Sequence, residues 1–87
     1  MQEDILLQQL ESLLQDLSIN LRYEKGDFQG GLCRVNGQKI FIINKKLPDE
    51  RKIEIVAQEL SRLDLDNVFI VPAVRKLIDE AMEESVV

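Results

Sequence analysis

Few residues in this chain have the chemistry that an active site needs. Histidine is absent, and the remaining reactive groups are carboxylates, lysines, serines, Tyr23 and one cysteine, Cys33. The lack of histidine removes the commonest general base near neutral pH and the commonest zinc ligand. Carboxylate pairs such as Asp79 with Glu83 stand at helical spacing in registers that face solvent, without the apolar setting of a catalytic acid. The sequence therefore predicts no catalytic residue.

Cys33 is the one potential nucleophile with a charged neighbour. Arg34 follows it directly, and a nearby positive charge can activate a thiol. No base that could accept the thiol proton is visible in the sequence, and a strand cysteine beside valine and isoleucine is usually a small buried hydrophobe. We therefore expect Cys33 to be buried, and a small enzyme that uses Cys33 or carboxylates is kept as an alternative.

Residues 57–63, AQELSRL, lie in a segment of helical periodicity that follows an apolar strand and a short link containing proline. This order, together with six residues of the segment 31–63, resembles the core of zincin-like metallopeptidases of the ImmA/IrrE type. The matching residues are Ile43, Asn44, Arg51, Ala57, Glu59 and Leu60. The resemblance implies a core of strands and helices in which one helix carries an HExxH motif that binds zinc.

Gln58 and Arg62 occupy the two positions at which that family has histidines. Two histidines four residues apart on one helix reach the same zinc ion, and the Glu between them polarises the attacking water. An amide oxygen is a poor zinc ligand, and a guanidinium keeps its positive charge. The resemblance therefore implies a metal-free relative, with no metal site and no cofactor, in which Glu59 has lost the family role.

Two alternatives remain for Gln58, Glu59 and Arg62, which are the candidate residues for binding a ligand or partner. On a solvated helix face, Arg62 is placed to pair with Glu59 three residues before it and with Asp66 four residues after it. In a converted pocket, the same side chains would hold an anionic ligand or a peptide.

The first predicted element is an amphipathic helix over residues 3–17. Its leucines recur at three- and four-residue spacings and form a wide apolar stripe. Part of this stripe also satisfies two heptads, which is short for a coiled coil. The stripe is predicted to pack in the core, and the alternative is an interaction stripe that contacts a second copy or another protein. The heptad residues are Leu7, Leu10, Leu14 and Leu17.

Strands are predicted in the middle of the chain. Residues 19–24 alternate apolar and polar side chains, as a half-buried strand does. Asn36-Gly37, between two apolar runs, predicts a two-residue hairpin turn. In that register one side of the hairpin carries Cys33, Val35, Ile40 and Ile42, and the other carries Leu32, Phe41 and Ile43 with Arg34 and Lys39. Helices must cover at least one side.

Two further helices complete the expected fold. Pro48 suits a first helical position and acids follow it in the first turn; the inward stripe of this helix is Ile53, Val56, Ala57, Leu60 and Leu63. Residues 68–71 are predicted to form a short strand or a connector. Pro72 then begins a third helix, whose inward residues are Val74, Leu77, Ile78, Ala81 and Met82. The prediction is a single α+β domain over residues 1–87, with a small antiparallel sheet of about three strands, built around a central hairpin, packed against three helices.

The net charge of −5 is distributed unevenly. Residues 1–18 sum to −4, residues 19–46 to +4 and residues 47–87 to −5. The basic region 22–46 could bind nucleic acid weakly through a sheet that also carries aromatic rings. A chain with a pI near 4.6 is nevertheless a poor partner for phosphate. Pairing of charges between packed elements explains the pattern as well.

The sequence excludes a membrane protein of the helical kind. No stretch approaches the roughly 18 uninterrupted apolar residues of a membrane span, and the acidic start MQEDILLQQL lacks the basic region of an export signal. A single cysteine fits a reducing compartment. We therefore expect a non-catalytic cytoplasmic protein that binds a protein partner or a second copy of itself, with nucleic acid as the minor alternative.

Overall fold

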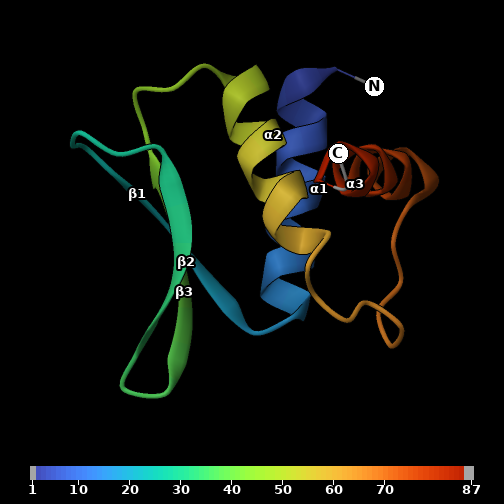
Figure 1. The fold of residues 1–87 in the computed structure, drawn as a ribbon, viewed down its shortest axis with the longest axis horizontal. Helices are drawn as coiled ribbons and strands as arrows, with labels where there is room; N and C mark the ends of the chain where they lie inside the picture. Colours follow the sequence, from blue (N-terminus) through green and yellow to red (C-terminus); the bar gives the residue numbers. More distant parts are fainter. Residues whose placement is uncertain (1, 86–87) are drawn as a thin grey trace.

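The chain folds into a three-stranded sheet with helices on one of its faces (Figure 1), as seen in a computed structural model that describes residues 2–85. Helices α1 and α2 lie against the sheet, and α3 packs on the other side of this helix pair. The elements are α1 (Glu3–Asp16), β1 (Ile19–Glu24), β2 (Gly30–Val35), β3 (Gln38–Asn44), α2 (Asp49–Leu60) and α3 (Pro72–Ser85). The α+β class, the hairpin and the three helices are confirmed.

Helix α1 buries leucines on two sides because it lies between the sheet and α3. Leu7, Leu10, Leu13 and Leu14 are buried, and Leu17 packs partly buried against the same core. A wide apolar stripe is needed to fill both contacts. The alternative in which Leu7, Leu10, Leu14 and Leu17 form a surface stripe for a partner is therefore wrong, since these side chains pack within the chain.

The sheet has the strand order β1-β3-β2 and is mixed. Strands β2 and β3 form the expected antiparallel hairpin, but β1 runs parallel to β3, from Ile19 opposite Lys39 to Glu24 opposite Asn44. The expectation of an antiparallel sheet is thus wrong for β1. Strand β3 takes the centre because its apolar run, KIFII, can be buried between two neighbours.

The hairpin turn has the geometry that its sequence predicts. Asn36 and Gly37 both have positive φ angles, 52° and 79°, which suits the right-handed twist of the flanking strands. The pairs Val35 with Gln38 and Leu32 with Phe41 follow the predicted register. The register fixes which side chains face the helices and which face away.

Helix α2 begins at Asp49, one residue after Pro48, and has Asp49 and Glu50 in its first turn. It approaches β2 closely at Gly30, where an added Cβ would lie 3.4 Å from Cγ2 of Ile55. Residues 68–71 form a connector without strand pairing, and α3 begins at Pro72 as predicted. Met82, expected to face inward, is exposed, because the buried stripe of α3 runs through Val74, Ile78 and Ala81.

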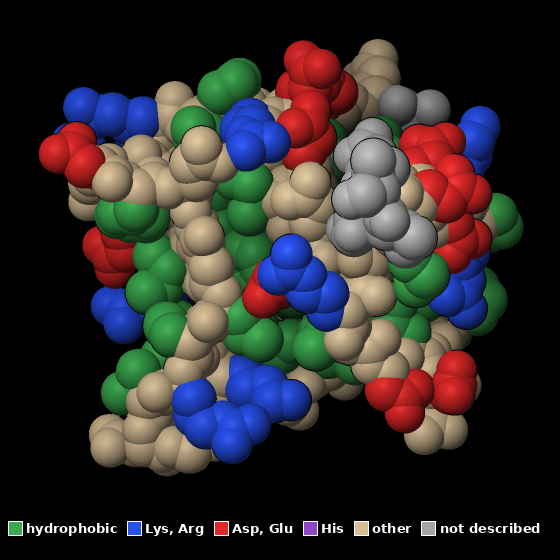
Figure 2. Space-filling model, viewed as in Figure 1, with side chains coloured by type: hydrophobic (Ala, Val, Ile, Leu, Met, Phe, Trp, Pro, Cys, Tyr) green, Lys and Arg blue, Asp and Glu red, His purple; other side chains and the backbone are tan. Residues whose placement is uncertain are grey.

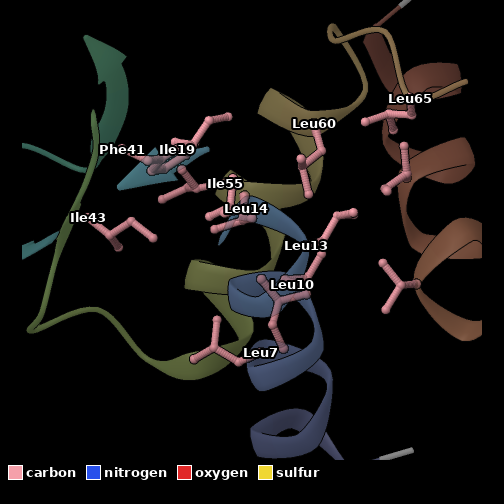
Figure 3. Packing of buried hydrophobic residues seen from close by; sticks show 14 residues of the cluster. Leu7, Leu10, Leu13, Leu14, Ile19, Phe41, Ile43, Ile55, Leu60 and Leu65 are labelled. Atoms are coloured by element: carbon pink, nitrogen blue, oxygen red, sulfur yellow. The ribbon is translucent and has the colours of Figure 1, made fainter. Parts of the chain in front are cut away.

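The core lies between the sheet and the helices (Figure 3). Phe41 and Ile43 of β3 point toward α1 and α2, where Leu14 and Ile55 lie nearest to them. All of these side chains are buried. No helix within residues 2–85 is long and apolar enough to cross a membrane.

Candidate functional site

Gln58, Glu59 and Arg62, the candidate residues for binding a ligand or partner, lie at the C-terminal end of α2. Gln58 and Glu59 are half-buried in the last turn, whereas Arg62 lies beyond the helix, which ends at Leu60. The side chain of Arg62 is 67% exposed, and its Nη1 donates to Oε2 of Glu59 at 3.3 Å. The predicted pair between Arg62 and Glu59 is confirmed.

Gln58 and Arg62 do not line a common pocket. Gln58 borders a cavity of about 90 Å³ between α2 and α3, whose lining includes Leu77 and Glu80 but not Arg62. Sites for small ligands are typically about 300–1,000 Å³. In the part of the chain that the structure describes, no group of three or more cysteine, aspartate or glutamate side chains lies close enough to hold a metal ion.

Asn44 and Arg51 both hold the loop between β1 and β2. They are two of the residues on which the family resemblance is based. The Asn44 side-chain amide donates to the carbonyl oxygens of Gly26 and Phe28, both at 2.8 Å. Arg51 donates to Oε1 of Gln29 at 2.5 Å and to Oε2 of Glu54 at 2.7 Å. These contacts give the two residues a structural role in this fold.

Cys33 lies on the face of the sheet that no helix covers. It is exposed, and its Sγ lies 3.5 Å from the carbonyl oxygen of Ile40, to which the thiol donates. The expectation that Cys33 is buried is therefore wrong. Both sides of the hairpin are apolar, and the helices cover the side of Phe41 and Ile43 instead of the side of Cys33.

We call the uncovered side the open sheet face, and its apolar members are Cys33, Val35, Ile40 and Ile42. Val35 is 49% exposed, and Ile40 and Ile42 are half-buried. On β1 the same face carries Arg22 and Glu24, which form an ion pair of 3.3 Å between exposed side chains. The open sheet face is thus an apolar surface bordered by one base and one acid.

The aromatic rings of the basic region do not gather on the open sheet face. Phe41 is fully buried and Tyr23 faces α1, whereas Phe28, in the loop between β1 and β2, is 38% exposed. The bases are also divided, because Arg22 lies on the open face whereas Arg34 and Lys39 lie on the opposite one. Figure 2 shows Lys and Arg side chains beside the hairpin end of the sheet, and Asp and Glu side chains on the side of α3.

A polar cluster around Tyr23 joins β1 to α1 and α2. The Tyr23 hydroxyl donates to Oε1 of Glu11 at 2.5 Å, and the ammonium of Lys52 lies 5.1 Å from the centre of the Tyr23 ring. Lys52 also pairs with Asp49 at 3.9 Å. Burial, followed by the hydrogen bond and charge of Glu11 and the charge of Asp49, raises the pKa of Tyr23 well above its usual range. Tyr23 is therefore a neutral hydrogen-bond donor here.

A groove of about 590 Å³ runs between α1 and β1 beside this cluster. Its α1 wall is polar, with Gln8, Glu11, Ser12 and Gln15, and its β1 wall is formed by Ile19, Asn20, Leu21 and Tyr23. Glu11 is engaged by Tyr23. The other polar side chains of this wall are neutral, so the groove suits hydrogen bonding more than binding of an ion.

Sequence reasoning missed the Tyr23 cluster and the groove. Glu11 and Tyr23 belong to different elements, and nothing in their spacing indicates that the short turn at Leu17 and Ser18 brings them together. The alternation of β1 did show that Tyr23 faces the same side as Ile19. That signal locates the side chain of Tyr23 but not its partner.

Comparison of the chain with protein-family models, with curated proteins and with solved structures found no match.

Proposed function

We propose that this chain is a non-catalytic, cytoplasmic protein-interaction module that binds a protein partner through the open sheet face. The observation that carries the proposal is the placement of α1 and α2 on one side of the sheet, which leaves Val35 and Cys33 exposed on the other. Burial of such apolar surface favours association. The adjoining Arg22 and Glu24 supply the polar rim that orients a partner.

The non-catalytic part of the proposal is supported by the residues around the candidate positions. Cys33 has Ile40 as its cross-strand neighbour and donates to a backbone oxygen, which is no acceptor for a catalytic proton. At the end of α2, Glu59 is paired with Arg62 in the position of a second zinc ligand. These features fit a metal-free relative of the zincin-like core, which we retain as part of the proposal. A cytoplasmic location is supported by the single cysteine.

The natural thiol allows a direct test. Cys33 is labelled with a maleimide photo-crosslinker, the protein is irradiated in an extract of cells that express the chain, and the captured protein is identified and purified. Binding of that purified protein is then measured with Val35→Lys, which places a charge on the open sheet face. Ile5→Lys is the matched control, because Ile5 is a comparably exposed apolar residue, 41% against 49%, on α1.

We expect Val35→Lys to weaken binding at least tenfold and Ile5→Lys to leave it unchanged. Equal binding by wild type and Val35→Lys would show that the captured protein uses another surface and would contradict the proposal. An excess of unlabelled chain should prevent specific capture. If no captured protein is lost in that competition, the proposal is contradicted as well.

A further inference from the structure

Strand β1 has a free edge whose backbone groups can be assigned from the hydrogen bonds around it. Beyond β1 no further strand of residues 2–85 is paired, because β1 is the outermost strand of the order β1-β3-β2. The carbonyl oxygen of Glu24 accepts the N–H of Lys45 at 3.0 Å, just after β3. Successive strand residues direct their N–H and C=O groups to opposite edges. Glu24 and Arg22 therefore face β3, whereas Leu21 and Tyr23 present theirs to the free edge.

The neighbouring hairpin supports the same assignment. Asn44 N–H donates to the carbonyl oxygen of Gln29 at 3.0 Å, so Asn44 is directed toward β2. The alternate residue Ile43 is then directed toward β1, as the parallel pairing of Glu24 with Asn44 requires. A row of unpaired N–H and C=O groups is a template for another strand.

The side chains of β1 are complementary to those of a second β1 in antiparallel orientation. Arg22 and Glu24 lie on the same face, two residues apart, with Tyr23 between them. If two copies are related by a two-fold axis at Tyr23, Arg22 of each copy lies opposite Glu24 of the other. Opposite charges at directly facing positions stabilise a strand pair.

The charge register and the hydrogen-bond register agree. In this arrangement Tyr23 faces Tyr23 of the second copy as a hydrogen-bonded pair, which requires that the backbone groups of Tyr23 point outward, as assigned above. Arg22 and Glu24 then fall at non-hydrogen-bonded positions, where facing side chains approach most closely. A slide of one strand by one residue would lose both matches, because Arg22 would then face Tyr23 or Lys25 of the other copy.

The groove between α1 and β1 leaves space beside the free edge, on the side of the sheet that the helices cover, for a second copy. A two-fold axis perpendicular to the sheet places both α1 helices on the same side of the joined sheet. The groove wall on α1 offers Gln8, Ser12 and Gln15, and each amide can donate to and accept from its counterpart. Glu11, the charged residue of that wall, is occupied by the Tyr23 hydroxyl.

The opposite edge of the sheet lacks this complementarity. Strand β2 contains Arg34 and no acid, and its cross-strand neighbour at that position is Lys39. Two copies paired through β2 would bring positive charge together without a reciprocal acid, which is how natural proteins protect an edge. Self-association is therefore expected at β1 and not at β2.

We infer that β1 pairs with β1 of a second copy, antiparallel and centred on Tyr23, to form a continuous six-stranded sheet. This inference goes beyond the proposed function, because it uses the strand edge and leaves the open sheet face free for another protein. In the dimer the open sheet faces of the two copies lie side by side on one surface.

Charge-reversed variants test the register directly. Molar mass is measured by light scattering and sedimentation equilibrium for wild type, Arg22→Glu, Glu24→Arg and an equimolar mixture of the two variants. Arg22→Glu places acid opposite acid in its own dimer, and Glu24→Arg places base opposite base, whereas the mixture restores opposite charges at every facing position. Both side chains are exposed, and circular dichroism checks that each variant is folded.

We expect a wild-type dimer, at least tenfold weaker dimerisation of each variant alone, and recovery of the dimer in the mixture. A wild-type chain that stays monomeric at high concentration would overturn the inference without affecting the proposed function. A dimer that both variants retain but Val35→Lys abolishes would also overturn it, and would show instead that the open sheet face binds a second copy.

Discussion

Replacement of Tyr23 by Phe tests the cluster that joins β1 to α1. The change removes the hydroxyl that donates to Glu11 at 2.5 Å and keeps the ring beneath Lys52. A hydrogen bond to a charged group contributes roughly 1.5–3 kcal/mol when it is desolvated. Because Tyr23 is 36% exposed, solvent weakens this bond, and we expect Tyr23→Phe to reduce the free energy of unfolding at neutral pH by about 1–1.5 kcal/mol, at or below the lower limit of that range.

The effect of this substitution has a defined pH dependence. The pKa of Tyr23 is higher in the folded chain, first through burial and then through Glu11 and Asp49. The resulting stabilisation is fully present below the unfolded pKa of about 10 and is lost as pH rises above it. Because Tyr23→Phe lacks the ionising group, the stability difference between the two proteins shrinks above about pH 10.

Two measurements check the reasoning. Urea unfolding followed by circular dichroism, at neutral and alkaline pH, gives the difference in the free energy of unfolding. Tyr23 is the only tyrosine and the chain has no tryptophan, so the ultraviolet absorbance of tyrosinate reports this residue alone. A folded-state phenol that titrates at its ordinary value, together with equal stability of wild type and Tyr23→Phe, would refute the argument.

Three further predictions follow from the core, the turn and the site. Phe41→Ala removes a fully buried ring and is expected to lower the free energy of unfolding by about 3–5 kcal/mol in a urea titration; a loss below about 1 kcal/mol would contradict the central place of this ring. Gly37→Ala, at a φ of 79°, is expected to cost roughly 1–2 kcal/mol, and no loss would mean that the turn differs. Calorimetric titration of pure protein with zinc is expected to show no binding of one ion per chain, and the zinc-treated protein is expected to have no peptidase activity, because Gln58 and Arg62 are unsuited as ligands. Tight binding of one zinc ion per chain would contradict the metal-free interpretation.

Local sequence signals predicted the hairpin and the helices, whereas the direction of β1 depends on a contact between strands that are distant in sequence. Asn36 and Gly37 specify both the turn and its register, because both need positive φ angles and the neighbours alternate. The direction of β1 depends on which strand it meets. Since β3 has the longest apolar run and takes the centre, β1 pairs with β3 and not with β2, its neighbour in sequence.

The candidate site was predicted less well than the fold. The pair Glu59 with Arg62 follows from helical spacing and is present. The exposure of Cys33 could not be predicted, because both faces of the hairpin carry apolar residues and only the packing of α1 and α2 decides which one is covered. The leucines of α1 likewise fit a seam or a core, and the position of α3 behind α1 settles them as core.

The parallel pairing of β1 has a consequence for the order of folding. The hairpin of β2 and β3 closes through a two-residue turn, whereas β1 must find β3 across the whole of that hairpin, from Ile19 to Lys39. Contacts distant in sequence form slowly because the intervening chain loses entropy first. Strand β1 should therefore dock late and detach early, so that the central strand β3 is briefly left with an uncovered edge whenever the protein opens.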